Sequence, residues 1–492
     1  MSELRRILLA SFDPVPDATG ASARLTELLR GLTPVFDVDA LTPKGEMHSH
    51  IERYYGARLM RVPMLKRDLP SRALTFERAM KRQLESNEYD LVHVTDPFGG
   101  YPTRQRRGLS SHRIVYDAHS LQSLWIRLAR PDLLSELRFI TRLRRLERHC
   151  LLSADLVLAS SEAFRGHLQL LGVPADRVRI VPPPIDLSRF REAPPPPGAP
   201  FRITHLGGAA AWEGTETLLD ALRVLLDQGV PARLSLAGER DAATRRFLRQ
   251  ALAARRLGDA VDLLGPLPHE QVPDLLEHTH VCVAPLSASP LVGPIGVGSM
   301  KVAEYLAAGR PVVAADTALH RELVGSSEAA GFFRAGDAPD LAQRLAQLWK
   351  DERRRMEMGD RARDRARTAF DAALSRRALL RAYYDLLDPS IIVNATAYAA
   401  ERSGAGSDSA TQAATVQTPE PVTNPALGEA TTNVSRVVPR GGPLPTPTSP
   451  APMAPAGKPP PPTADLTAPE ALPDAVQEDA DWFSGHLPDD AG

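Results

Sequence analysis

Residues 298–314 have the sequence GSMKVAEYLAAGRPVVA, a pattern that predicts a short helix, a tight turn and a buried strand. Glycines at 293, 296 and 298 free the backbone just before the helix, and Ser299 can cap it by accepting a backbone N–H. Gly309 is expected to end the helix, and the β-branched residues after Pro311 are expected to form the strand.

The start of this helix has the properties of a phosphate site. A glycine-rich approach, free backbone N–H groups and the helix dipole all favour an anion at a helix N-terminus. One turn further along, Glu304 carries a carboxylate that can accept hydrogen bonds from two neighbouring sugar hydroxyls. The pattern therefore predicts nucleotide binding, with a phosphate at the helix start and a ribose beside Glu304.

Composition limits the class of protein. With 492 residues, of which 43% are hydrophobic, the chain is too long for one domain and can fill more than one core. A formal net charge of -1 argues against a general nucleic-acid binder. Cys150 and Cys282 fall in different expected domains, so neither a disulfide framework nor a metal cluster is predicted. Because its apolar runs are too short for a signal peptide or a membrane span, we expect a cytoplasmic protein.

Apolar strands alternate with amphipathic helices in two successive rounds. The first round has expected strands at 7–10, 91–94, 114–116 and 156–159, and helices over 24–32 and 133–152. The second has strands at 201–206, 233–237, 261–264, 281–284 and 312–314, a helix over 215–228 and a helical run over 338–387. This alternation predicts two α/β, doubly wound, Rossmann-like domains in tandem, with a ligand cleft at the carboxyl ends of their parallel strands.

The expected domain boundaries follow from this alternation. Residues 1–190 are expected to form the N-terminal domain and residues 200–370 the C-terminal one. Residues 191–199 contain four consecutive prolines, which favour an extended linker. Residues 371–388 are expected to form a helix that can pack back on the N-terminal domain.

The end of the chain has a different composition. From residue 389 to 492, Pro, Ala, Thr, Ser and Gly dominate, which predicts a disordered tail because little apolar surface can be buried. Residues 465–492 carry acidic side chains without Lys or Arg, and Trp482-Phe483 lies among them. Two interpretations stay open here, a solvated tail and a docking motif for a protein partner.

Four segments follow one another in an order typical of a known enzyme family. They are Asp117-Ala118-His119, Ser160-Ser161-Glu162, the stretch from Val181 to Phe190, and the run from Lys301 to Val313. Together they resemble the retaining glycosyltransferases of family 4, which have the GT-B fold, over about residues 5–388. The resemblance implies an enzyme that transfers a hexosyl or related sugar from a nucleotide-sugar donor to a glycan or lipid-linked acceptor. It also implies retention of configuration and no bound metal or other cofactor.

The same resemblance assigns roles to particular residues. The expected substrate-binding residues are Gly20, Gly207, Gly208, Gly298, Ser299, Met300 and Glu304. His119 is expected to contact the transferred sugar or the reacting centre, and Lys301 to reach a phosphate as a point charge. These two are the candidate catalytic residues. Ordinary structural roles, such as a surface lysine or a core histidine, stay open for both.

The family pattern fails at two places. Gly296 stands where a second glutamate is expected, eight positions before Glu304. Gly208 and Glu213 stand where the family has an Arg and a Lys that neutralise the leaving diphosphate. An anion there is expected to repel the diphosphate unless Lys301, Arg24 or another group substitutes, and one lost contact of this kind costs about 2.7–4 kcal/mol.

These departures leave alternative functions open. The first is a catalytically degenerate GT-B protein that serves as a binding or scaffold module. The second is a sugar phosphorylase on the same fold, for which the sequence shows no phosphate or cofactor motif.

A basic segment in the first half of the chain allows two interpretations. Residues 101–150 contain eleven Arg against four Asp or Glu, and Leu143 and Leu146 belong to an apolar face at helical spacing. One interpretation is an amphipathic helix that touches anionic lipid at the inner face of the membrane and holds a lipid-linked acceptor. The other, which we favour, is a packed helix with a solvated arginine face.

Overall fold

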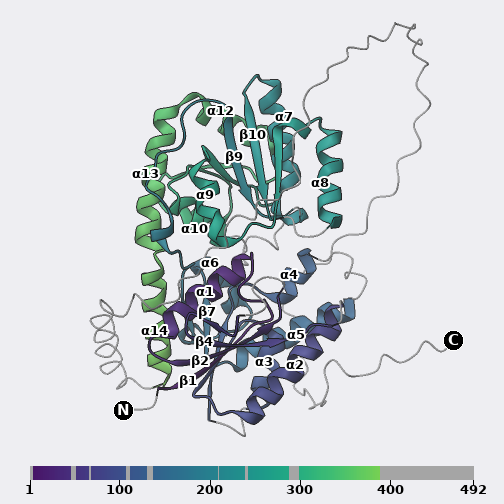
Figure 1. Ribbon diagram of the computed structural model, residues 1–492, viewed down its shortest axis with the longest axis vertical. Helices are drawn as coiled ribbons and strands as arrows, with labels where there is room; N and C mark the ends of the chain where they lie inside the picture. The colour runs from purple at the N-terminus through teal and green to yellow at the C-terminus, as the bar shows by residue number, and fades with distance from the viewer. Residues whose placement is uncertain are drawn as a thin grey trace, which may run out of the picture. The chain divides into compact units, whose positions relative to one another are not determined.

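The computed structural model describes residues 4–45, 51–65, 68–106, 111–129, 137–208, 210–238, 242–287 and 299–387. These residues belong to one compact unit, which contains two β-sheets (Figure 1). The expectations for residues 389–492, including the acidic end with Trp482-Phe483, lie outside the described residues.

The first sheet has eight strands in the order β3-β4-β2-β1-β5-β6-β7-β8. Every neighbouring pair is parallel except β3 and β4. The strands are β1 (Arg6–Ala10), β2 (Asp37–Pro43), β3 (Arg53–Tyr54), β4 (Ala57–Val62), β5 (Leu91–Val94), β6 (Arg113–Asp117), β7 (Leu156–Ala159) and β8 (Val178–Ile180). The helices are α1 (Gly20–Leu32), α2 (Leu69–Ser86), α3 (Pro97–Gln105), α4 (Gln122–Ala129), α5 (Leu137–Ser153), α6 (Glu162–Leu170), η2 (Ala175–Arg177) and η3 (Leu187–Arg189).

Both faces of this first sheet are buried, as parallel sheets require. Ile7 and Leu9 of β1 pack with α1 and with α14 (Ala372–Leu387), whereas Ala10 lies against Gly99 of α3 on the other face. This alternation follows from the two-residue period of a strand. The last helix of the described chain therefore contributes to the core of the first domain.

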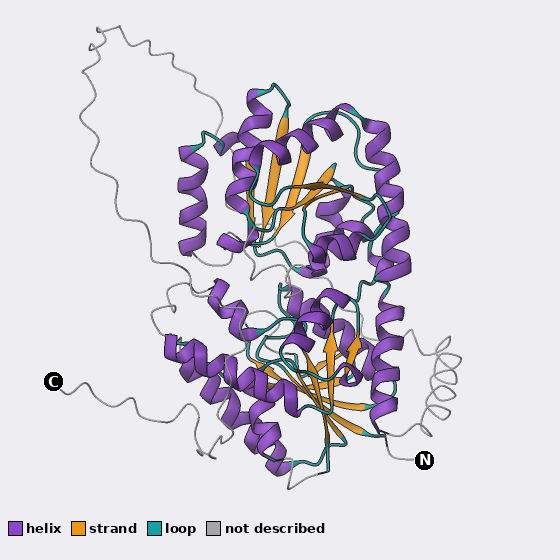
Figure 2. Ribbon diagram, turned by 180° about the vertical axis from the view of Figure 1, so that it is seen from behind, coloured by secondary structure: helices purple, strands orange, loops and turns teal. Residues whose placement is uncertain are grey.

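The second sheet has six parallel strands in the order β11-β10-β9-β12-β13-β14. They are β9 (Phe201–Leu206), β10 (Ala232–Ala237), β11 (Val261–Gly265), β12 (Val281–Ala284), β13 (Val312–Ala315) and β14 (Ala330–Phe333). The helices are η4 (Ala211–Glu213), α7 (Thr215–Asp227), α8 (Ala242–Ala254), η5 (Gly258–Ala260), η6 (His269–Gln271), α9 (Val272–Glu277), α10 (Ser299–Ala307), α11 (Ala318–Val324), α12 (Ala338–Lys350) and α13 (Glu352–Ala369). Figure 2 shows helices on both sides of the strands in each domain.

The second core also alternates by face. Val281 and Val283 of β12 pack with α7 and α12, and Cys282 and Ala284 pack with α10 and α13. Two doubly wound Rossmann-like domains, the predicted fold class, are thus confirmed. The boundaries assigned to them from sequence stay a prediction.

The helical run expected over 338–387 is divided into three helices. Asp351 separates the first two, because its side chain accepts the backbone N–H of Arg354 at 2.9 Å and caps α13. Phe370 and Asp371 separate α13 from α14, and Ala372 N donates to Ile185 O at 2.9 Å. Sequence analysis missed the break at Asp351, because Arg is frequent on both sides of this cap, whereas it placed a boundary between residues 370 and 371.

The proline-rich linker forms neither helix nor strand, as expected for its composition. It is nevertheless held in place at one carbonyl, because Ala193 O accepts hydrogen bonds from Arg310 and Arg363, both at 3.0 Å. The Arg310 side chain is buried beneath it. The linker is therefore fixed to the second domain at this point.

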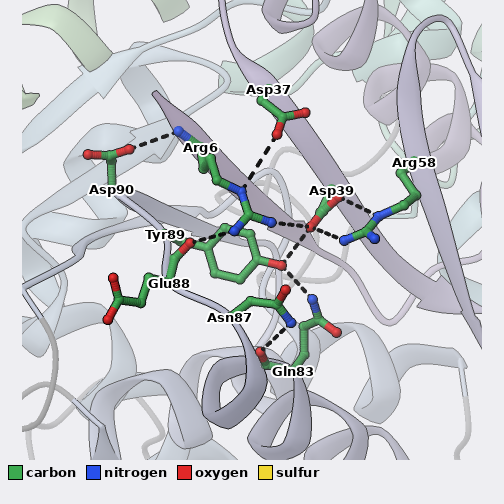
Figure 3. A network of polar contacts seen from close by, with 9 residues as sticks. All are labelled: Arg6, Asp37, Asp39, Arg58, Gln83, Asn87, Glu88, Tyr89 and Asp90. Carbon is green, nitrogen blue, oxygen red and sulfur yellow. Dashed lines mark hydrogen bonds and ion pairs between the residues drawn. The ribbon is translucent and has the colours of Figure 1, made fainter. Parts of the chain in front are cut away.

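A polar network connects three neighbouring strands of the first sheet at their amino ends (Figure 3). Asp39 accepts two hydrogen bonds from Arg58, at 2.8 and 2.7 Å, and one from the Tyr89 hydroxyl at 2.7 Å. Arg6 N donates to Asp90 at 2.8 Å. Burial opposes ionisation of Asp39, but the hydrogen bonds from Arg58 and Tyr89 outweigh it and lower the pKa of the carboxyl. The network fixes the edge of the sheet opposite the carboxyl ends where a ligand would bind.

Tyr383 provides a test of the contact between α14 and the first domain. Its hydroxyl lies 2.5 Å from His93 Nδ1, and both side chains are fully buried. Tyr383→Phe leaves the His93 nitrogen without this partner, so we expect the free energy of unfolding to fall by about 1–3 kcal/mol. Urea unfolding measures the change. The control is Tyr384→Phe on the same helix, for which we expect little change; equal losses in the two variants would contradict the assignment.

Candidate functional site

Helix α10 places two charged side chains at the carboxyl ends of the second sheet. Lys301 and Glu304 are three residues apart and therefore lie on one face of the helix. Glu304 is only 6% exposed, which is unusual for a helix carboxylate. The helix ends as expected, because Gly309 adopts a positive φ of 62° and its N–H donates to Leu306 O.

Lys301 is paired with the acid that the sequence identified as a departure from the family pattern. Its ammonium nitrogen lies 3.0 Å from Glu213 Oε1 and 5.8 Å from the centre of the Trp212 ring. Glu213 is therefore a neutralised anion, and the repulsion expected from its sequence position is offset by Lys301. Sequence reasoning missed this pairing because the two residues are 88 positions apart.

Glu304 has a partner that was also missed. His269 Nδ1, at the start of η6, lies 3.1 Å from Glu304 Oε1. His269 could have been identified from the sequence, because it follows β11 and therefore lies at the same edge of the sheet as α10. A cavity of about 140 Å³ opens beside His269 and is also lined by Glu27, Arg30 and Asp186.

The loop after β1 brings the first domain to the start of α10. Thr19 caps α1 by accepting the Ser22 N–H at 3.0 Å, and Gly20 is the first residue of that helix. A Cβ placed on Gly20 would lie 3.6 Å from Met300 Cβ, so the two helix starts face each other closely. Gly298 lies outside the described residues, and for Ser299 only its position as the first residue of α10 is described.

His119 follows β6, as expected, and is half-buried. Its Nδ1 is enclosed and makes no hydrogen bond to any residue the structure describes. Burial lowers the pKa of His119 and Arg24 adds to this effect, although Asp117 opposes it, so the ring is neutral at pH 7. A neutral ring with a free nitrogen can accept or donate one hydrogen bond to a ligand.

Arg24 does not supply the missing cation of the diphosphate site. Its guanidinium makes two hydrogen bonds to Asp117, at 2.9 and 3.0 Å, and both side chains are almost completely buried. Burial would raise the pKa of Asp117, but Arg24 and His93 outweigh it and hold that pKa well below its usual range. Arg24 is therefore unavailable to substitute for the family's Arg or Lys, which leaves Lys301 or another group for that role.

The two domains also meet through two tryptophans close to the Lys301–Glu213 pair. Trp125 of α4 packs edge-on against Trp212, with ring centres 5.9 Å apart. Helix α4 is itself positioned by Glu147, which accepts the backbone N–H groups of Gln122 and Ser123. The first domain thus contacts the segment that carries Glu213.

The last part of the basic segment forms a packed helix, α5. Leu143 and Leu146 are buried, whereas Arg142, Arg144 and Arg145 are exposed. None of the helices in the described ranges is long and apolar enough to cross a membrane. Contact of the arginine face with a membrane surface stays a prediction.

Two family models match successive parts of the chain. The model described as Glycosyltransferase Family 4 matches residues 18–189, and the model described as Glycosyl transferases group 1 matches residues 200–351. The chain belongs to the GT-B glycosyltransferases. The first match covers the domain of this GT-B glycosyltransferase that carries Gly20 and His119. The second covers the domain that carries Lys301 and Glu304.

Curated relatives of this GT-B glycosyltransferase act in glycan and inositol glycoside synthesis, according to their names. The putative colanic acid biosynthesis glycosyltransferase WcaL of Escherichia coli is 29% identical over 229 residues, which are 46% of this chain and 55% of the relative. The D-inositol 3-phosphate glycosyltransferase of Nocardia farcinica is 27% identical over 65% of this chain and 72% of the relative. The matched region thus spans about half the length of WcaL.

Solved structures of similar fold include two from cyanobacteria. Sucrose-phosphate synthase of Thermosynechococcus elongatus has a TM-score of 0.66 at 23% identity and matches 78% of this chain and 99% of its own. HepE of Anabaena in complex with UDP-glucose has a TM-score of 0.61 at 17% identity, matching 77% of this chain and 99% of its own. At these identities the likeness establishes the shared GT-B fold.

Proposed function

We propose that the protein transfers a hexosyl or related sugar from a nucleotide-sugar donor to a glycan or lipid-linked acceptor, with retention at the anomeric carbon. The observation that carries this proposal is α10, which presents Lys301 and Glu304 from one face at the carboxyl edge of the second sheet. An ammonium group suits a diphosphate, and a neighbouring carboxylate suits the hydroxyls of a ribose. The names of the curated relatives, and the UDP-glucose held by HepE, support a donor of this class.

The proposed reaction breaks the bond between the sugar and the diphosphate and forms a bond to an acceptor hydroxyl. Positive charge develops on the sugar and negative charge on the departing diphosphate, so a fixed cation lowers the barrier. Lys301 supplies that cation, and Glu304 with His269 fixes the nucleoside. Because Lys301 carries the charge, we propose that the transfer needs no bound metal.

His119 and Gly20 belong to the acceptor side of the proposed site. The enclosed, unpartnered Nδ1 of His119 offers one hydrogen bond to the transferred sugar or to the acceptor. Gly20 lies at the start of α1 and faces Met300 at the start of α10, where an added Cβ would make an ordinary van der Waals contact at 3.6 Å. Both domains must hold their substrates in register for transfer to occur.

A thermal-shift panel tests the donor site. UDP, ADP, GDP and their sugar conjugates are added to the wild type and to Glu304→Ala, with and without EDTA. We expect at least one nucleotide to raise the Tm of the wild type, equally in EDTA, and a much smaller shift for Glu304→Ala. Glu357→Ala, which removes an exposed glutamate from α13, is the matched control. No stabilisation of the wild type by any nucleotide would refute the donor site.

A degenerate GT-B binding module is the second candidate, favoured by Gly208 and Glu213 in place of two cations. One measurement, the release of nucleoside diphosphate, distinguishes this binding module from the enzyme. Nucleotide binding with no release of nucleoside diphosphate from any bound nucleotide sugar would support the binding module.

A further inference from the structure

Three polar atoms of the second domain converge on the backbone of Gly207. A Cβ placed on Gly207 would lie 2.4 Å from Glu213 Oε1, and 2.8 Å from both Lys301 Nζ and His205 Nε2. Glu213 and His205 are buried, and the Lys301 side chain is only 13% exposed. The pair between Glu213 and Lys301 therefore lies against the first turn after β9 and is largely removed from water.

Gly208 makes room for this arrangement. A Cβ on Gly208 would lie 3.1 Å from Glu213 Oε2, so the carboxylate would have to shift slightly to admit a side chain there. The backbone after Glu213 is much more constrained, because a Cβ on Gly214 would lie 1.6 Å from Pro285 O. The absence of a cation at position 208 and the presence of an acid at position 213 thus belong to one local structure.

The pair with Glu213 restrains the Lys301 side chain but occupies only part of its hydrogen-bonding capacity. An ammonium group has three N–H donors, and within the described residues its recorded hydrogen bond goes to Glu213. Trp212 lies beside the ammonium and limits its movement. Two donors remain for an anionic ligand, on a side chain whose many rotamers have already been restricted.

We infer that Glu213 is the positioning residue for Lys301, so that a cation of the proposed diphosphate pocket stands on α10 and is held there by an acid from η4. The inference rests on the proposed function, since it assigns a role within the same donor site. Glu213 then holds the cation in place, and the repulsion expected from sequence is the smaller effect.

His205 is buried beside the same glycine, Gly207. Its Nδ1 lies 3.0 Å from Val283 O and must donate to that carbonyl, so its buried Nε2 presents a lone pair toward Gly207. Burial and the neighbouring Lys301 lower the pKa of His205 to about 4. His205 is therefore uncharged at neutral pH and adds no positive charge to this cluster.

Exchanging the pair is the first test. Affinity for the nucleoside diphosphate that most stabilises the wild type, among UDP, ADP and GDP, is measured by calorimetry. We expect Lys301→Glu alone to abolish measurable binding, and the double variant Glu213→Lys with Lys301→Glu to recover it to within about tenfold of the wild type. A double variant that is folded by circular dichroism but binds as weakly as Lys301→Glu would overturn the inference.

The second test separates positioning from repulsion. Glu213→Gln keeps an acceptor for Lys301 and is expected to bind within about threefold of the wild type. Glu213→Ala removes the acceptor and is expected to weaken binding about tenfold, equivalent to ~1.4 kcal/mol. If repulsion dominates, both variants bind more tightly, and the inference is wrong. Glu216→Ala, which removes an exposed acid from the next helix, is the control and is expected to bind like the wild type.

The possible failures can be told apart. If the wild type binds no nucleoside diphosphate, the proposed function fails and this inference fails with it. If the wild type binds and Glu213→Ala binds equally well, the inference alone fails. If Lys301→Glu also binds equally well, the role of Lys301 in the proposed function fails with it.

Discussion

Lys301→Gln is expected to lower the release of nucleoside diphosphate from the donor by about 10²–10³-fold, because it removes the fixed charge that stabilises the leaving group. Affinity for the nucleoside diphosphate is expected to fall about 10–100-fold, the value of one hydrogen bond to a charged group. Turnover is thus affected more than binding. A steady-state assay of nucleoside diphosphate release and calorimetry on the same preparation measure the two effects.

Two controls accompany this variant. Lys350→Gln removes an equivalent charge from the exposed end of α12 and is expected to leave both quantities unchanged. Lys301→Gln also leaves Glu213 buried without its counter-ion, which destabilises the fold. The double variant Lys301→Gln with Glu213→Gln avoids this cost and is expected to fold like the wild type while still failing to turn over. A double variant with full activity would exclude Lys301 from the reaction.

Asp117→Asn is expected to reduce the free energy of unfolding by about 3–5 kcal/mol, because it leaves the Arg24 guanidinium buried without its partner charge. The two side chains are 0% and 3% exposed, so water cannot replace the lost carboxylate. The effect is comparable to a large part of the stability of an ordinary domain. Chemical denaturation monitored by circular dichroism measures it.

The pH dependence of this loss has a definite sign. The folded-state pKa of Asp117 is depressed, so the pair contributes its full stability above the ordinary aspartate pKa of about 3.9 and loses it as the pH falls further. The difference between wild type and Asp117→Asn is therefore expected to be constant from pH 5 to 8 and to shrink in acid. The exposed pair of Arg233 and Asp262 has the same two-bond geometry, so Asp262→Asn is the matched control. An equal loss in that variant would contradict the role of burial.

Much of the fold was predictable because both sheets are parallel, apart from the short β3–β4 pair, and are buried on both faces. Such strands appear in the sequence as short apolar runs, and β5, β7, β9 and β12 have the predicted bounds. The break between α12 and α13 was not predictable in the same way. It depends on the cap formed by Asp351, whose effect is local and leaves the surrounding composition unchanged.

The sequence proposed individual residues of the candidate site but not the contacts between them. Glu304 and Lys301 could be identified because they lie in one continuous motif with glycines before and after it. The partners His269 and Glu213 come from other loops at the same sheet edge, and sequence spacing carries no information about such contacts. Arg24 illustrates the opposite error, since a candidate cation proved to be bound to Asp117.

Helix α14 has a consequence for how the chain reaches its native state. Leu379, Ala382 and Tyr383 fill the core of the first domain, yet they are synthesised only after the whole second domain. While the ribosome is still translating, Leu29, Leu32 and Phe36 of that core lack their cover. A fragment ending at residue 190 is therefore expected to aggregate, and the smallest soluble product of a truncation series should extend through Leu387.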